Sequence, residues 1–190
     1  MTPAADASVV EPLAVSLPWS ALLNHFYNRA GLPLPGIEPL QGADVPEPYR
    51  SLLVHSRDMT PTLEAHHQGP IHVLVLNRER REGDYWREVV LRGARDGRPV
   101  AYGVIRICLA HLPPAAARSV LEERRPLGRI LQTESIPHLS WPQAFFSVEA
   151  DARLGAILRL QAPGILYGRR NVLLDASRRL IAEVIEILPP

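Results

Sequence analysis

The chain has 190 residues, of which 46% are hydrophobic and 22% charged, so it can bury a core and is not disordered. Its 21 basic residues are all arginine and face 20 acidic residues. The resulting net charge of +1 excludes a general attraction to nucleic acid or to an anionic membrane. The single cysteine, Cys108, excludes an internal disulfide and a metal site built from several cysteines.

The start of the chain bears on location and domain organisation. No apolar run approaches the roughly 20 residues that cross a bilayer, and residues 1–15 lack the charged and apolar regions of a secretory signal. We therefore expect a cytoplasmic protein without a membrane span. Residues 1–17 are rich in alanine, proline and serine and are expected to form a flexible arm. The remaining length predicts a single domain over residues 18–190.

Two helices are predicted in the first third of the chain, each with a proline near its start. Pro18 begins a helical pattern of apolar residues that ends at Gly31. The connector over residues 32–49 carries five prolines, which predict irregular structure. The second helix is expected to begin at Thr60 as its N-cap, with Pro61 in the first helical position.

The period of the pattern then changes from helical to alternating. Strands are predicted over residues 71–76, 85–92 and 100–109, and Asp96-Gly97 between the last two is a hairpin signal.

The remaining segments complete the predicted fold class. A helix is predicted over residues 115–123, residues 133–163 show no clear pattern, and two more strands cover residues 165–174 and 180–188. Consecutive strands joined by short turns pair antiparallel. The predicted class is therefore α+β, with an antiparallel sheet covered by a few helices.

Sequence motifs for phosphate loops, nucleophile elbows and zinc proteases are absent. His66 and His67 are adjacent and cannot face one metal from a helix, so we expect a solvated helix end. Cys108 alternates into a strand and is expected to be a small core residue. We expect neither a metal nor a cofactor.

Charged residues on apolar strand faces are the more informative feature. Arg87 shares its face of the strand with Val89 and Leu91. Glu186 lies on an apolar face of the last strand, and Glu183 lies among apolar residues on the opposite face of that strand. A buried charge needs a partner. Two interpretations stay open.

The first interpretation is that Arg87 and Glu186 neutralise each other inside the core. The second is that both face one enclosed apolar space and bind a small aromatic acid. Arg87 would then take the carboxylate, and Glu186 a hydroxyl at the far end.

Five segments occur in the order found in chorismate pyruvate-lyases, and over residues 52–190 the chain resembles that family. They are Asp58-Met59-Thr60 with Leu63-Glu64, Tyr85-Trp86-Arg87-Glu88-Val89, Pro126-Leu127-Gly128-Arg129-Ile130-Leu131, Leu166-Tyr167-Gly168-Arg169-Arg170, and the terminal Glu186-Ile187-Leu188-Pro189-Pro190.

The resemblance implies a fold and an activity. The fold would be a six-stranded antiparallel sheet covered by helices, with an internal, water-excluded ligand cavity closed by flaps. The activity would be that of a carbon-oxygen lyase, which eliminates pyruvate from chorismate to give 4-hydroxybenzoate for ubiquinone biosynthesis, without metal or cofactor.

The resemblance also implies roles for particular residues. Arg87 would hold the aromatic carboxylate, backbone amides of Met59 and Leu127 would add donors, and Glu186 would meet the ring oxygen and could act as the acid. Further candidates are Arg106 and Arg169.

Two departures from the family pattern keep other functions open. The third strand lacks the expected arginine after a small residue, and residues 132–163 form a longer segment than expected. The fold is shared with ligand-sensing domains of transcription regulators. The alternatives are therefore binding or conversion of a different small aromatic acid, or a non-catalytic protein that binds a ligand or partner. No helix-turn-helix pattern precedes the domain, so we expect no nucleic-acid partner. The resemblance to the lyase family implies a monomer.

Overall fold

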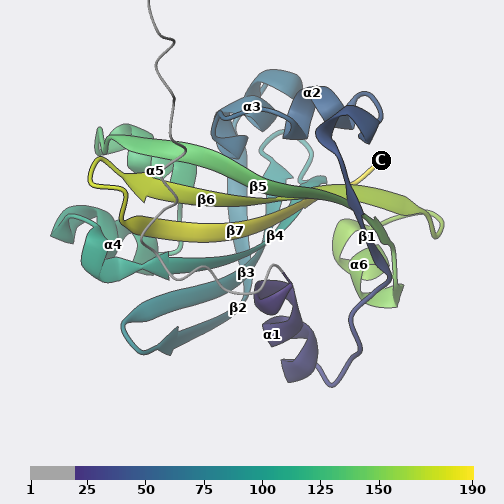
Figure 1. Ribbon diagram of the computed structural model, residues 1–190, viewed down its shortest axis with the longest axis horizontal. Helices are drawn as coiled ribbons and strands as arrows, with labels where there is room; N and C mark the ends of the chain where they lie inside the picture. The colour runs from purple at the N-terminus through teal and green to yellow at the C-terminus, as the bar shows by residue number, and fades with distance from the viewer. Residues whose placement is uncertain (1–19) are drawn as a thin grey trace, which may run out of the picture.

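The computed structural model describes residues 20–190, and the expected arm over residues 1–17 lies outside this part of the chain. The fold is built on a sheet in the strand order β1-β5-β6-β7-β4-β3-β2, in which every neighbouring pair is antiparallel (Figure 1). The strands are β1 (Ile37–Leu40), β2 (Ile71–Arg81), β3 (Asp84–Gly93), β4 (Pro99–Cys108), β5 (His138–Glu149), β6 (Ile165–Asp175) and β7 (Leu180–Leu188).

Helices cover both faces of this sheet. They are α1 (Ala21–Arg29), α2 (Tyr49–Leu53), α3 (Met59–His66), α4 (Pro114–Leu121), α5 (Leu127–Thr133) and α6 (Ala152–Leu158), with short 3-10 turns η1 (Gly42–Asp44) and η2 (Leu109–His111). The apolar residues of α1 and α6 pack together on one face, and those of α2 to α5 pack on the other. The arrangement confirms the predicted α+β class.

Alternation along β3 assigns its side chains to the two faces. Trp86 belongs to the core beneath α1 and α6, whereas Tyr85 and Leu91 belong to the cores beneath α2 to α5. The hairpin between β3 and β4 turns at the predicted dipeptide, where Gly97 has a positive φ of 66°.

The sheet has seven strands in place of the six that the resemblance implies. The extra strand, β1, lies within the proline-rich connector that we expected to be irregular. It pairs with β5 at the edge of the sheet, where Pro39 is tolerated because an edge strand leaves one row of amides unpaired.

The segment without a clear pattern, residues 133–163, contains β5 and α6. The register of β5 shifts between Pro142 and Ala144, which interrupts the alternation that identifies a strand. The predicted start of the second helix is also wrong by two residues: Asp58 is the N-cap of α3, and Pro61 is its third residue. A proline is accepted there because amides of the first turn have no partner within the helix.

The packing around Gly168 of β6 explains why the Leu166-Tyr167-Gly168 motif contains a glycine. A Cβ added at Gly168 would lie 2.6 Å from the Glu186 carbonyl oxygen and 2.5 Å from the Phe146 ring. The motif therefore reflects a close approach of chain to chain in the core.

Within residues 20–190, no helix is long and apolar enough to cross a membrane.

Candidate functional site

A pocket lies between the sheet and the first turns of α3 and α5. Its floor comes from the five strands β2, β3, β4, β6 and β7. Met59 and Leu127, the first residues of these two helices, line it together. Most of the lining is apolar, as in Val89, Ile105 and Val184. The pocket has a volume of about 70 Å³. That it is enclosed and excludes water stays a prediction.

The register of the sheet sets the order of residues across the floor. Arg87 of β3 pairs with Ile105 of β4, which pairs with Val184 of β7, which pairs with Asn171 of β6. Neighbouring strands are about 4.8 Å apart, so the Cα atoms of Arg87 and Asn171 are separated by about 14 Å. Arg87, Asn171 and Glu186 therefore reach the pocket from different strands.

Arg87 is 2% exposed, and among the described residues neither its Nε nor its Nη1 has a hydrogen-bond partner. Burial lowers the pKa of its guanidinium, while Tyr85 and Glu123 act in the opposite direction. An arginine keeps its charge despite such a shift, because its ordinary pKa is so high. The pocket therefore contains a buried cation without a direct counterion.

Glu186 has a different partner from the one proposed in the first interpretation. Its Oε2 accepts a hydrogen bond of 2.7 Å from Nε of Arg169. No ion pair joins Arg87 to Glu186, so the interpretation that these two residues neutralise each other is wrong.

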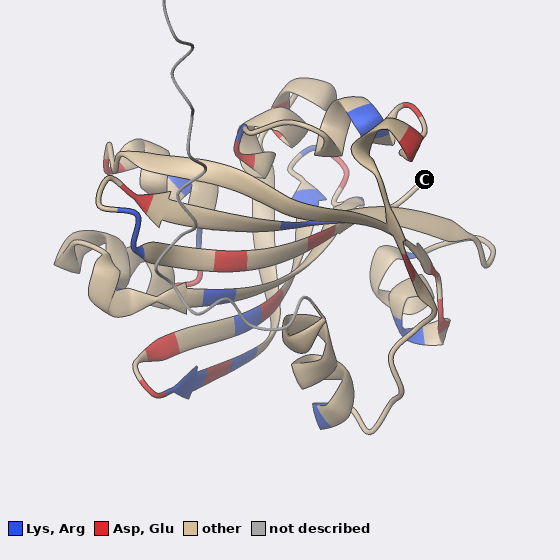
Figure 2. Cartoon of the chain, viewed as in Figure 1, with Lys and Arg blue, Asp and Glu red and all other residues tan. Residues whose placement is uncertain are grey.

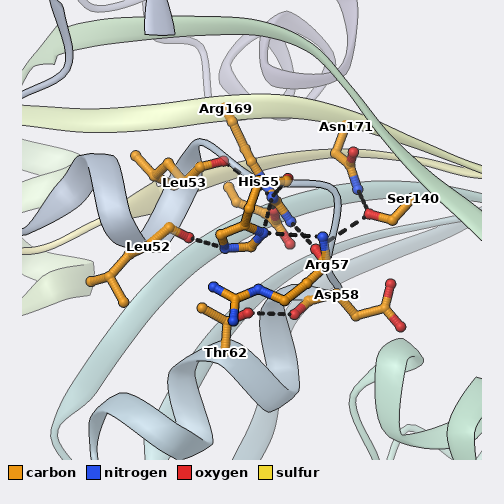
Figure 3. A network of polar contacts seen from close by, with 10 residues as sticks. Leu52, Leu53, His55, Arg57, Asp58, Thr62, Ser140, Arg169 and Asn171 are labelled. Carbon is orange, nitrogen blue, oxygen red and sulfur yellow. Dashed lines mark hydrogen bonds and ion pairs between the residues drawn. The ribbon is translucent and has the colours of Figure 1, made fainter. Parts of the chain in front are cut away.

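Arg169 is fully buried and does not line the pocket, although it is tied to the pocket through Glu186. Its remaining nitrogens donate to backbone carbonyls of Leu53 at 3.2 Å, His55 at 3.0 Å and Arg57 at 3.2 Å. Figure 3 shows these contacts from β6 to the segment before α3. Arg169 is thus a positioning residue, which orients Glu186 and holds the chain that leads into α3.

Asp58, the N-cap of α3, faces a histidine from β5. Its Oδ2 lies 2.8 Å from Nε2 of His138, whose Nδ1 lies 2.8 Å from the Ile136 carbonyl oxygen. Both ring nitrogens of His138 face acceptors, which favours the doubly protonated ring. The Asp58 contact accordingly raises the pKa of His138, against the opposing effect of burial.

Asn171 is a pocket residue that the sequence did not single out. It is 2% exposed and its Nδ2 donates to Ser140 Oγ at 2.9 Å, but its Oδ1 has no hydrogen-bond partner among the described residues. Alternation could have indicated it, because Asn171 shares one face of its strand with Arg169.

Arg106, one of the further candidates, is not part of the pocket. It pairs with Asp84 at 2.9 Å and with Glu183 at 3.2 Å, and Glu183 also pairs with Arg170 at 2.8 Å. Figure 2 shows basic and acidic residues on neighbouring strands of the sheet. Arg106 thus has a structural role in a buried ion-pair cluster.

Other candidate chemistry is limited in the described part of the chain. Residues 20–190 contain no group of three or more His, Cys, Asp or Glu side chains that could hold a metal ion. His66 and His67 are exposed at the end of α3, and Cys108 is buried and free, as expected.

No protein-family model and no curated protein matches the sequence. Among solved structures, the fold is similar to the effector domain of PhnF from Mycobacterium smegmatis, at 15% identity and a TM-score of 0.51, over 69% of this chain and 87% of that one. Another structure of PhnF covers 90% of this chain and 94% of its own, at 14% identity and a TM-score of 0.49. A GntR-family transcriptional regulator from Bacillus cereus covers 63% and 92%, at 14% identity and a TM-score of 0.46.

The likeness to the PhnF effector domain shows the fold alone, and it agrees with the expectation that ligand-sensing domains share this fold. It also corrects the expected activity. The fold likeness is to an effector domain, so a lyase acting on chorismate in ubiquinone biosynthesis is unsupported. In one of the five motifs, the glycine Gly168 has a packing role in the core.

Proposed function

We propose that the pocket binds a small organic acid and that the chain acts as a ligand-binding protein without turning that ligand over. The observation that carries the proposal is the buried guanidinium of Arg87, whose Nε and Nη1 lack a hydrogen-bond partner within residues 20–190. A buried charge without a partner is costly. A carboxylate offers two acceptors with the geometry of the guanidinium and would remove this cost.

Two features around Arg87 favour an acid with an apolar body. The walls of the pocket are mostly apolar side chains, which would stabilise the body of the ligand by burial. The first turn of α3 also faces the pocket, and its leading amides have no partner within the helix. They would add donors near Met59 for the acid group.

The size of the pocket sets a condition on the ligand. Its volume of about 70 Å³ is smaller than the roughly 150 Å³ apolar cavity that admits benzene. We therefore propose that α3 and α5 move apart when an acid with an aromatic ring enters. The effector-domain fold shared with PhnF supports binding as the function of such a pocket.

Calorimetric titration with benzoate tests the proposal. We expect wild-type protein to bind benzoate and Arg87→Met to bind it at least about tenfold more weakly, because hydrogen bonds to charged groups contribute about 1.5–3 kcal/mol. Arg80→Gln, an exposed arginine of β2, is the matched control and should bind as wild type does. Equal affinities of wild type and a folded Arg87→Met, or no binding by wild type, would reject the proposal.

A further inference from the structure

The orientation of the Asn171 amide is fixed by its neighbours. Ser140 Oγ donates to the Arg57 carbonyl oxygen at 3.4 Å, so it accepts from Asn171 Nδ2 at 2.9 Å. Figure 3 shows this chain of contacts. With Nδ2 engaged, the group that remains is the carbonyl oxygen Oδ1, an acceptor.

That oxygen is a buried acceptor without a partner in the described chain, on a residue that lines the pocket. Buried polar atoms in native proteins are nearly always hydrogen-bonded, so each exception requires a physical reason. Residues 20–190 offer no donor to this oxygen, and a ligand in the pocket could supply one.

Glu186 provides a second acceptor close to Asn171. Asn171 pairs with Val184, and Glu186 is two residues further along β7, so Asn171 and Glu186 are diagonal neighbours on one face. The contact with Arg169 uses Oε2 of Glu186. The pocket thus presents a donor, Arg87, on β3 and two acceptors on β6 and β7.

The charges facing the pocket decide the charge of the ligand. Glu186 is balanced by Arg169, and Asp58 is balanced by His138 when that ring is protonated. Arg87 remains without a direct counterion. A ligand with one negative charge completes this balance, so the group that meets the two acceptors is a neutral donor and not an ammonium group.

On the basis of the proposed function, we infer that the ligand is a monoanionic acid that carries, at the end away from its carboxylate, a neutral group with two N–H or O–H donors, such as a primary amine on an aromatic ring. Asn171 is then the residue that selects for this group. A ligand without a donor there leaves Oδ1 buried and unpaired, and sites built this way discriminate strongly against such analogues.

Two probes of nearly the same shape test the inference by calorimetry: 4-aminobenzoate and 4-methylbenzoate. We expect wild type to prefer the amine by about tenfold or more. In Asn171→Leu this preference should disappear, while 4-methylbenzoate should bind at least as tightly as before. Ser140→Ala is the second variant: it frees the amide to rotate and should reduce the preference without changing the pocket lining.

Three outcomes separate this inference from the proposed function. Equal affinities of wild type for the two probes would overturn the donor requirement while leaving the acid site intact. A full preference for the amine in folded Asn171→Leu and in Ser140→Ala would overturn the role of Asn171. Failure of wild type to bind benzoate or either probe would overturn the proposed function, and this inference with it.

Discussion

Arg87 differs from the other buried charges of the sheet because no residue in the described part of the chain forms an ion pair with it. Glu88, which is fully buried, accepts hydrogen bonds of 2.6 and 2.8 Å from Arg153, and Glu183 is paired with Arg170. These pairs belong to the structure of the core. The unpaired guanidinium of Arg87 also lines the pocket. We therefore expect the ligand to bind to Arg87.

Arg169 is predicted to contribute mainly to stability. Replacing it with methionine leaves the Glu186 carboxylate and three backbone carbonyls without their donor. We expect Arg169→Met to lower the free energy of unfolding by about 3–5 kcal/mol, as measured by urea denaturation. Glu186→Gln keeps the shape and an acceptor and should cost much less. A loss below about 1 kcal/mol in Arg169→Met would contradict this role.

At the scale of the elements, α3 is held at its start by contacts from β5 and β6. His138 of β5 contacts the N-cap Asp58. Arg169 of β6 donates to the carbonyl oxygens of the preceding segment, as Figure 3 shows. At the pocket, Gly128 of α5 lies against Thr60 of α3. The position of α3 therefore controls both the pocket lining and the space available to a ligand.

The contact between His138 and Asp58 predicts a pH dependence of stability. The pKa of His138 is raised in the folded protein, chiefly by the Asp58 contact. The protonated ring therefore stabilises the fold fully below the unfolded pKa of about 6.5, and this contribution is lost as the pH rises through the folded pKa.

We expect His138→Gln to lower the melting temperature more at about pH 5.5 than at about pH 9. His72→Gln, at an exposed position of β2, is the control and should not reproduce this difference between the two pH values. The same decrease for His138→Gln at both pH values would show that this contact is not an ion pair.

A designed disulfide tests whether α3 and α5 must separate for a ring-sized acid to enter. A Cβ added at Gly128 would lie 3.4 Å from Cβ of Thr60, near the Cβ–Cβ distance of about 3.8 Å in disulfides. We expect oxidised Thr60→Cys/Gly128→Cys to bind benzoate at least about tenfold more weakly than the same protein after reduction. Cys108 is buried and should not interfere. Equal binding before and after reduction would mean that the helices need not separate.

At the scale of the whole molecule, alternation was sufficient to predict the class and the central strands, because β3, β4, β6 and β7 have regular patterns and short turns. It could not find β1 or β5, since Pro39 lies at a sheet edge and the register of β5 shifts after Pro142. A sequence pattern reports the face of a strand and carries no information on where an edge or a bulge falls.

The site was predictable in part for the same reason. Strand alternation placed Arg87 and Glu186 on apolar faces, and the structure brings both to one pocket. The partner of Glu186, the ion pairs of Arg106 and the open acceptor of Asn171 depend on residues distant in the chain. Contacts between residues distant in the chain therefore decide which of the buried charged side chains has no ion-pair partner within residues 20–190.

The most direct test of the account is a crystal structure of the protein with benzoate bound. The account predicts a carboxylate within hydrogen-bond distance of Nε or Nη1 of Arg87, with the ring between the sheet and the first turns of α3 and α5. A benzoate bound elsewhere on the molecule, with the guanidinium of Arg87 still unpartnered, would contradict it.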